Sequence, residues 1–129
     1  MKSIIVSMFA AAGLMAAGSV LAADVPAVAK KYDCITCHDV DKKKIGPSWM
    51  EISKFYNGKS EKTPSGRTVQ EATGGEAADL FLEEKISKGG HGNWGNQPML
   101  ANDNVYHQQS PVKQADIKEL VHYILDLAK

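Results

Sequence analysis

The sequence predicts a small all-α domain built from about four short helices. Apolar residues recur three and four positions apart in several separate segments, as they do on one face of a helix. Stretches rich in glycine and proline divide these segments. No run of alternating apolar and polar residues marks a strand. The 15 basic and 15 acidic residues balance, so the charge does not favour binding to nucleic acid.

The N-terminus has the features of an export signal. Lys2 precedes an apolar run from Ile4 to Val20, and a small residue follows at Ala22. We therefore expect a signal peptide over residues 1–22 and one mature domain over residues 23–129. The run is marginal in length for a transmembrane helix, so a retained anchor is the alternative. We expect no stable membrane insertion of the mature chain, because no second apolar segment follows.

The first helix is expected from Asp24 to Asp33, with Asp24 as N-cap and Pro26 in the first turn. A second helix is expected from its N-cap Ser48 to Tyr56. The apolar face of the first helix consists of Val25, Val28, Ala29 and Tyr32.

The motif Cys34-Ile35-Thr36-Cys37-His38 follows the first helix. The pattern C-x-x-C-H is the attachment sequence of c-type haem. Residues three apart share a face of a helical turn, so both thiols can reach the two vinyl groups at one porphyrin edge. His38 can then place a ring nitrogen on the iron as the proximal ligand. The motif therefore predicts one covalent haem c.

Three other interpretations of the cysteines remain open at this point. A thioredoxin-type redox pair would need a βαβ surround, which the pattern does not supply. A zinc site needs about four ligands, and only His91, His107 and His122 remain for it. A disulfide between Cys34 and Cys37 would close a very short loop and add little stability.

The Ile45-Gly46-Pro47 stretch predicts a turn. Because proline lacks an N–H, the Pro47 carbonyl could accept the second ring N–H of His38 and orient the imidazole. An ordinary turn is the alternative.

The composition of residues 57–75 predicts a long polar loop without regular structure. Loops of this length are usually functional or mobile. Arg67 in this loop could pair with a haem propionate, although a solvated surface position is more usual for arginine.

Residues 91–111 contain too many glycines, prolines and asparagines for a helix. The segment nevertheless holds Trp94 and Met99, which need a large group to cover them. Met99 follows Pro98, which stiffens the backbone there, and we interpret Met99 as the distal iron ligand. A methionine that fills a gap in the core is the alternative.

Two further helices complete the expected fold. One spans Glu76 to Lys88, with acidic residues at its start and Gly89-Gly90 at its end. The last begins with Ser110 as N-cap and Pro111 as first helical residue. His122 lies opposite its apolar stripe and is expected to face solvent. The stripe consists of Ile117, Leu120, Val121, Ile124, Leu125 and Ala128.

With the haem motif and the Gly-x-Trp-Gly-x-x-Pro-Met stretch of residues 92–99, the chain resembles the short bacterial class I cytochromes c of denitrifiers and ammonia oxidisers. The resemblance covers nearly the whole mature chain. It implies a cytochrome c fold around one haem, with Tyr32 meeting the region of Tyr123 where the first and last helices cross. Leu100-Ala101 stands where the family commonly has a proline pair, which could loosen the Met99 loop. Residues 57–75 and 105–109 are longer than the corresponding family segments.

The resemblance also implies roles for individual residues. Cys34 and Cys37 would form the thioethers, and His38 and Met99 the axial ligands. Three residues would support them: Pro47 orients His38, Trp94 packs near a propionate, and Asn102 hydrogen-bonds near the methionine sulfur.

The implied function is electron transfer and not catalysis, because two filled axial positions keep substrates off the iron. We expect a monomeric periplasmic carrier that moves one electron between respiratory partners. Its contacts would be transient and would surround the haem edge near Cys37, Ile45 and the Met99 loop. One alternative is a haem protein with a displaceable Met99, acting as a ligand sensor or weak peroxidase. Another is a subunit of a larger respiratory complex.

Overall fold

A computed structural model describes residues 24–102 and 111–129 of the chain. The predicted signal peptide of residues 1–22 and the extension at 105–109 lie outside the described residues. The described part forms five α-helices and one 3-10 helix, and its β-pairing is a single bridge between Gly90 and Met99. None of these helices combines the length and apolar character that a bilayer crossing requires. The elements are α1 (Ala27–Lys31), η1 (Cys34–Thr36), α2 (Trp49–Tyr56), α3 (Val69–Thr73), α4 (Ala78–Lys88) and α5 (Gln114–Asp126).

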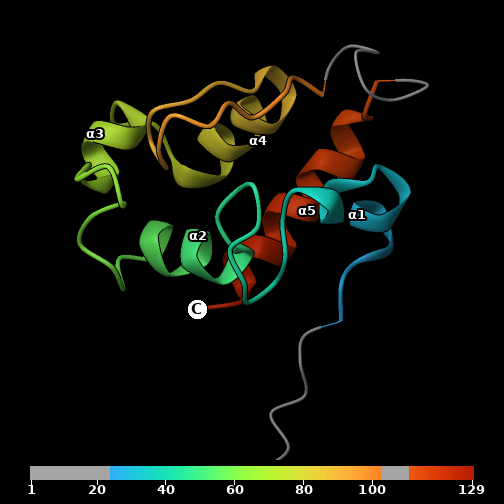
Figure 1. Cartoon of the computed structure of the whole chain (residues 1–129), viewed down its shortest axis with the longest axis horizontal. Coiled ribbons are helices and arrows are strands. Elements are labelled where there is room, and N and C mark those ends of the chain that lie inside the picture. The colour runs from blue at the N-terminus through green and yellow to red at the C-terminus, as the bar shows by residue number, and fades with distance from the viewer. Residues whose placement is uncertain (1–23, 103–110) are drawn as a thin grey trace, which may run out of the picture.

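Helix α5 packs against α1, α2 and α4, and Figure 1 shows it running through the middle of the molecule. Its predicted stripe is confirmed, since Ile117, Leu120, Val121 and Ile124 are buried, and His122 is exposed as expected. Ser53 of α2 is fully buried and joins α2 to the end of α5. Its hydroxyl donates to the Leu125 carbonyl and accepts the Ala128 N–H.

The predicted ends of the first and last helices are wrong. Helix α1 starts after Pro26 and not at Asp24, and a turn follows it because Asp33 adopts the left-handed conformation, with φ of 56°. Helix α5 starts at Gln114, with Lys113 as N-cap in place of Ser110, which lies outside the described residues. The N–H of Val112 donates to the Asn102 carbonyl at 2.9 Å, so this stretch pairs with a distant segment before the helix begins.

The first and last helices meet as the resemblance implied, but at a different residue. The Tyr32 hydroxyl donates to Asp116 Oδ2 at 2.6 Å, about two turns before Tyr123. Tyr123 instead packs edge-on against Trp49, with ring centroids 5.9 Å apart.

The second helix agrees with its prediction, because Ser48 caps α2 and forms a capping box with Glu51. Helix α4 begins two residues later than expected, at Ala78, and ends at Lys88 as expected, with Gly89 as its C-cap. The prediction of an irregular stretch across residues 57–75 is wrong where α3 forms. A capping box between Thr68 and Glu71 starts α3, a helix in addition to the four that were expected.

Candidate functional site

A cleft of about 370 Å³ lies between the Cys34–His38 motif, α4 and the segment that follows α4. Its size falls in the range of ligand pockets. The structure brings together in this cleft every residue that the sequence assigned to the site. They are Cys34, Cys37, His38, Pro47, Trp94, Met99 and Asn102. Apolar side chains supply much of the wall between them, among them Ile52, Phe81, Leu82, Ile86, Leu120 and Ile124.

The imidazole of His38 is held in one orientation. Its Nδ1 lies 2.7 Å from the Pro47 carbonyl oxygen, and a carbonyl can only accept, so Nδ1 carries the proton. The lone pair of Nε2 is therefore available to a metal. Burial lowers the pKa of His38, against the opposing effect of the Pro47 hydrogen bond. The ring also stacks on Trp49, and a Cβ at Gly46 would lie 2.5 Å from its Cε1.

The two cysteines stand at the ends of one tight turn. The N–H groups of Cys37 and His38 both donate to the Cys34 carbonyl, at 3.2 and 3.0 Å. Both thiols are free and half-buried. Burial raises the pKa of Cys34, whereas a thioredoxin-type nucleophile needs a lowered one. No group of three potential metal-binding His, Cys, Asp or Glu residues occurs within residues 24–102 and 111–129, so nothing described there supports the zinc interpretation.

Met99 lies on a backbone that is fixed by several contacts. Its N–H and carbonyl both pair with Gly90, each at 2.9 Å. Gly89 has a φ of 69°, and a Cβ there would collide with the Met99 carbonyl. Asn102 is buried just beyond, and its Nδ2 donates to the carbonyls of Ile86 at 2.9 Å and Leu100 at 3.3 Å. These bonds attach the segment that carries Met99 to the end of α4.

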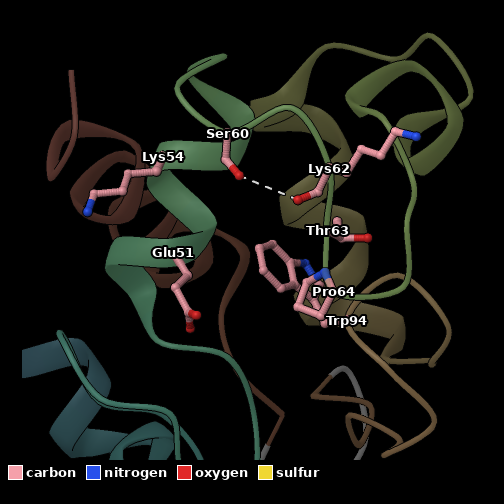
Figure 2. A pocket seen from close by; sticks show the side chains of 7 residues that line it. All are labelled: Glu51, Lys54, Ser60, Lys62, Thr63, Pro64 and Trp94. Atoms are coloured by element: carbon pink, nitrogen blue, oxygen red, sulfur yellow. Dashed lines mark hydrogen bonds between the residues drawn. The ribbon is translucent and has the colours of Figure 1, made fainter.

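Trp94 packs edge-on against Phe55, with ring centroids 5.6 Å apart. Burial raises the pKa of Tyr56 to about 12, although the hydrogen bond with Trp94 opposes this shift. Since an indole N–H can only donate, the Tyr56 oxygen is the acceptor. Trp94 also lines a second cavity of about 300 Å³ on the surface (Figure 2). Arg67 is exposed and does not line the haem-motif cleft.

Lys85 of α4 also lines the cleft and was not assigned to the site from the sequence. Burial lowers the pKa of its ammonium group. The available signal was its place on the apolar side of the helix, between Leu82 and Ile86. A cation held there could offset the charge of an acidic ligand.

The donor set fits a covalently attached haem. Two thiols at one side of an apolar cleft suit the two vinyl groups of a porphyrin. The imidazole nitrogen of His38 and the thioether of Met99 are both ligands that haem iron accepts. This combination is specific, because it consists of two thiols, an imidazole and a thioether that all line the same cleft.

Known proteins support the same conclusion. The family described as Cytochrome c matches residues 17–128. Cytochrome c-552 of Nitrosomonas europaea is 35% identical over 128 residues, which cover 98% of this chain and 99% of that protein. Cytochrome c-552 of Hydrogenobacter thermophilus is 32% identical over 100 residues, 78% of each chain. The crystal structure of wild-type Nitrosomonas europaea cytochrome c552 aligns with a TM-score of 0.54 and 33% identity, covering 78% of this chain and 95% of that chain. The chain thus belongs to the cytochrome c family, as a class I c-type cytochrome with a covalently attached haem c that serves electron transfer.

Proposed function

We propose that the mature chain is a monomeric periplasmic carrier that moves one electron between respiratory redox partners. The observation that supports this most is the shared cleft of His38 and Met99, in which Nδ1 of His38 is already bonded and Nε2 is free. A bound haem supplies the reversible change between ferric and ferrous iron. With both axial positions taken, no site remains for a substrate.

Each proposed ligand has a distinct task. The thiols of Cys34 and Cys37 would hold the haem covalently, as thioethers to its two vinyl groups. The hydrogen bond to Pro47 makes Nε2 of His38 a stronger donor. The thioether of Met99 favours the ferrous state and raises the potential.

Three other residues have supporting roles in this proposal. Trp94 would lie near a haem propionate, and Asn102 keeps the methionine segment in place through the hydrogen bonds that its Nδ2 donates to the Ile86 and Leu100 carbonyls. The half-buried Lys85 in the cleft lining would offset the negative charge of a propionate.

Partners would dock at the mouth of the cleft. Ile45 and Leu100 both line it and are 53% and 55% exposed. Exposed apolar side chains beside a redox centre suit the small, transient contacts of electron-transfer proteins. Export would be directed by residues 1–22, leaving the domain of residues 23–129 free to diffuse between partners.

The test is an optical spectrum of the holoprotein from a host that exports and matures c-type cytochromes. Met99→Ala should abolish the sulfur-to-iron charge-transfer band of the ferric protein. Met50→Ala is the matched control, since Met50 is half-buried in α2 and does not line the cleft. A band that survives in Met99→Ala would mean that another residue binds the iron.

One observation favours a second candidate, a haem protein with a displaceable Met99. Leu100 follows the methionine and is exposed, where a stiffer proline pair would hold the loop. Rapid carbon monoxide binding to the reduced protein at neutral pH would support a sensor or a weak peroxidase. Absence of such binding supports the carrier.

A further inference from the structure

Residues 58–75, here called the α3 segment, form an ordered unit and not an open loop. The Thr63 N–H donates to the Arg67 carbonyl at 2.9 Å, and the Gly66 N–H donates to the Thr63 carbonyl at 2.8 Å. Thr63 is buried, as are Ala72 and Thr73 within α3. The segment therefore has its own hydrogen bonds and a side that packs against the rest of the protein.

One contact joins the α3 segment to residues 89–99, here called the methionine loop. The Nδ2 of Asn93 donates to the Ala72 carbonyl at 3.2 Å, and this bond is buried. Ala72 lies in the last turn of a five-residue helix, where carbonyls have no partner within the helix. The Asn93 side chain therefore satisfies an end of α3 that would otherwise be buried without a hydrogen bond.

A second link lies one residue further along the methionine loop. Thr63 and Pro64 of the α3 segment line the surface cavity together with Trp94, and Figure 2 draws all three side chains at this cavity. Trp94 also lines the haem cleft. Trp94 thus borders both cavities, and at the surface cavity it shares the lining with the α3 segment. In Figure 1, α3 stands at the edge of the molecule beside the chain that follows α4.

We propose that the α3 segment positions the methionine loop, and with it the Met99 thioether, through Asn93. This rests on the proposed function, in which Met99 is the distal iron ligand. Asn93 is a positioning residue, six positions before Met99. On the C-terminal side of Met99, Asn102 attaches the chain to the end of α4, and on the N-terminal side Asn93 attaches it to α3. Displacement of Met99 by an external ligand requires this support to be released.

The test compares Asn93→Ala with Asn96→Ala in the holoprotein. Asn96 is an exposed asparagine of the same loop and does not line the cleft. We measure the charge-transfer band and the affinity of the ferric protein for cyanide, which must displace the methionine. Asn93→Ala should bind cyanide about fivefold more tightly than wild type, as expected when one buried hydrogen bond no longer opposes opening. Asn96→Ala should match wild type.

A second variant weakens the α3 segment without touching the methionine loop. Thr68→Ala removes the hydroxyl that accepts the Glu71 N–H in the capping box of α3 and should also tighten cyanide binding. If both residues act through one contact, the effects of the two substitutions will not add in the double variant. Ser53→Ala is the stability control, because it loosens the α2–α5 junction and should leave cyanide affinity unchanged. Thr68→Ala also keeps the test decisive if Asn93→Ala does not fold.

The outcomes separate this proposal from the one on which it rests. A wild-type ferric protein without the charge-transfer band would overturn the assignment of Met99, and the positioning role with it. A normal band with equal cyanide affinity in wild type, Asn93→Ala and Thr68→Ala would overturn the positioning role alone.

Discussion

Gly46→Ala tests how tightly the turn behind His38 confines its imidazole. The added Cβ would lie 2.5 Å from Cε1, about 0.9 Å inside the 3.4 Å at which ordinary contact begins. Gly46 is not among the glycines with positive φ, so alanine fits the backbone and the whole effect falls on the ring. A shift of that size is enough to take Nδ1, now 2.7 Å from the Pro47 oxygen, out of hydrogen-bond range.

The expected effect on stability follows from two contributions. Overpacking of this kind costs about 1–3 kcal/mol, and the lost hydrogen bond costs about 1 kcal/mol. In a domain of this size, a loss of roughly 2–4 kcal/mol lowers Tm by about 10–20 °C. The lost bond also weakens the imidazole as a donor, so the ferric state is stabilised less and the midpoint potential rises.

Thermal unfolding and a redox titration of the holoprotein measure both effects. Ser53→Ala is the control, because it should lower Tm and leave the potential unchanged. A Gly46→Ala protein with wild-type Tm and wild-type potential would show that the imidazole is not confined by the turn.

Three further outcomes are expected. Ser53→Ala should lower the free energy of unfolding by about 1–3 kcal/mol, because the buried Ala128 N–H loses the hydroxyl to which it donates, whereas the Leu125 carbonyl keeps its hydrogen bond from Asn57 Nδ2; denaturant unfolding measures this. Lys85→Gln should lower the midpoint potential, because a cation beside the haem disfavours the more positive ferric state; a redox titration shows the sign. The hydrogen bond from Tyr32, and to a lesser extent the one from Lys31, lowers the pKa of the Asp116 carboxyl group. These bonds therefore stabilise the folded protein fully at any pH above the ordinary carboxyl pKa, and this stabilisation is lost as the pH falls through the lowered pKa of Asp116. Asp116→Asn should therefore lower Tm at pH 7, and the difference from wild type should disappear in strong acid.

The parts of the site that sequence reasoning could predict are those with fixed chemistry and spacing. The two thiols and the histidine must be adjacent to serve one haem, so the motif identifies them wherever it occurs. The buried apolar face of α5 could be predicted as well, because a long helix repeats its apolar period several times. Pro47 was predictable as an acceptor because it follows the motif in a tight turn.

The parts that sequence reasoning missed depend on contacts between distant segments. Helix α3 is too short to show an apolar period, although Thr68 and Glu71 carried a capping signal. The Ala72 carbonyl in the last turn of α3 accepts a hydrogen bond from the side chain of Asn93, which is 21 residues away in the sequence. The start of α5 was placed too early because Val112 pairs with Asn102, a contact that no local pattern reveals.

The two sides of the proposed haem site are therefore held in different ways. The orientation of His38 depends on the adjacent turn, through Gly46 and Pro47. Met99 is held locally by its two hydrogen bonds with Gly90 and, in our proposal, also by α3, which is more than twenty positions away. Because the two sets of contacts share no residue, their perturbations should be independent. The double variant Gly46→Ala, Asn93→Ala should show the potential shift of the first and the cyanide affinity of the second, each unchanged in size. A coupling between the two would mean that the turn and the methionine loop move as one unit, and that the haem itself transmits the displacement.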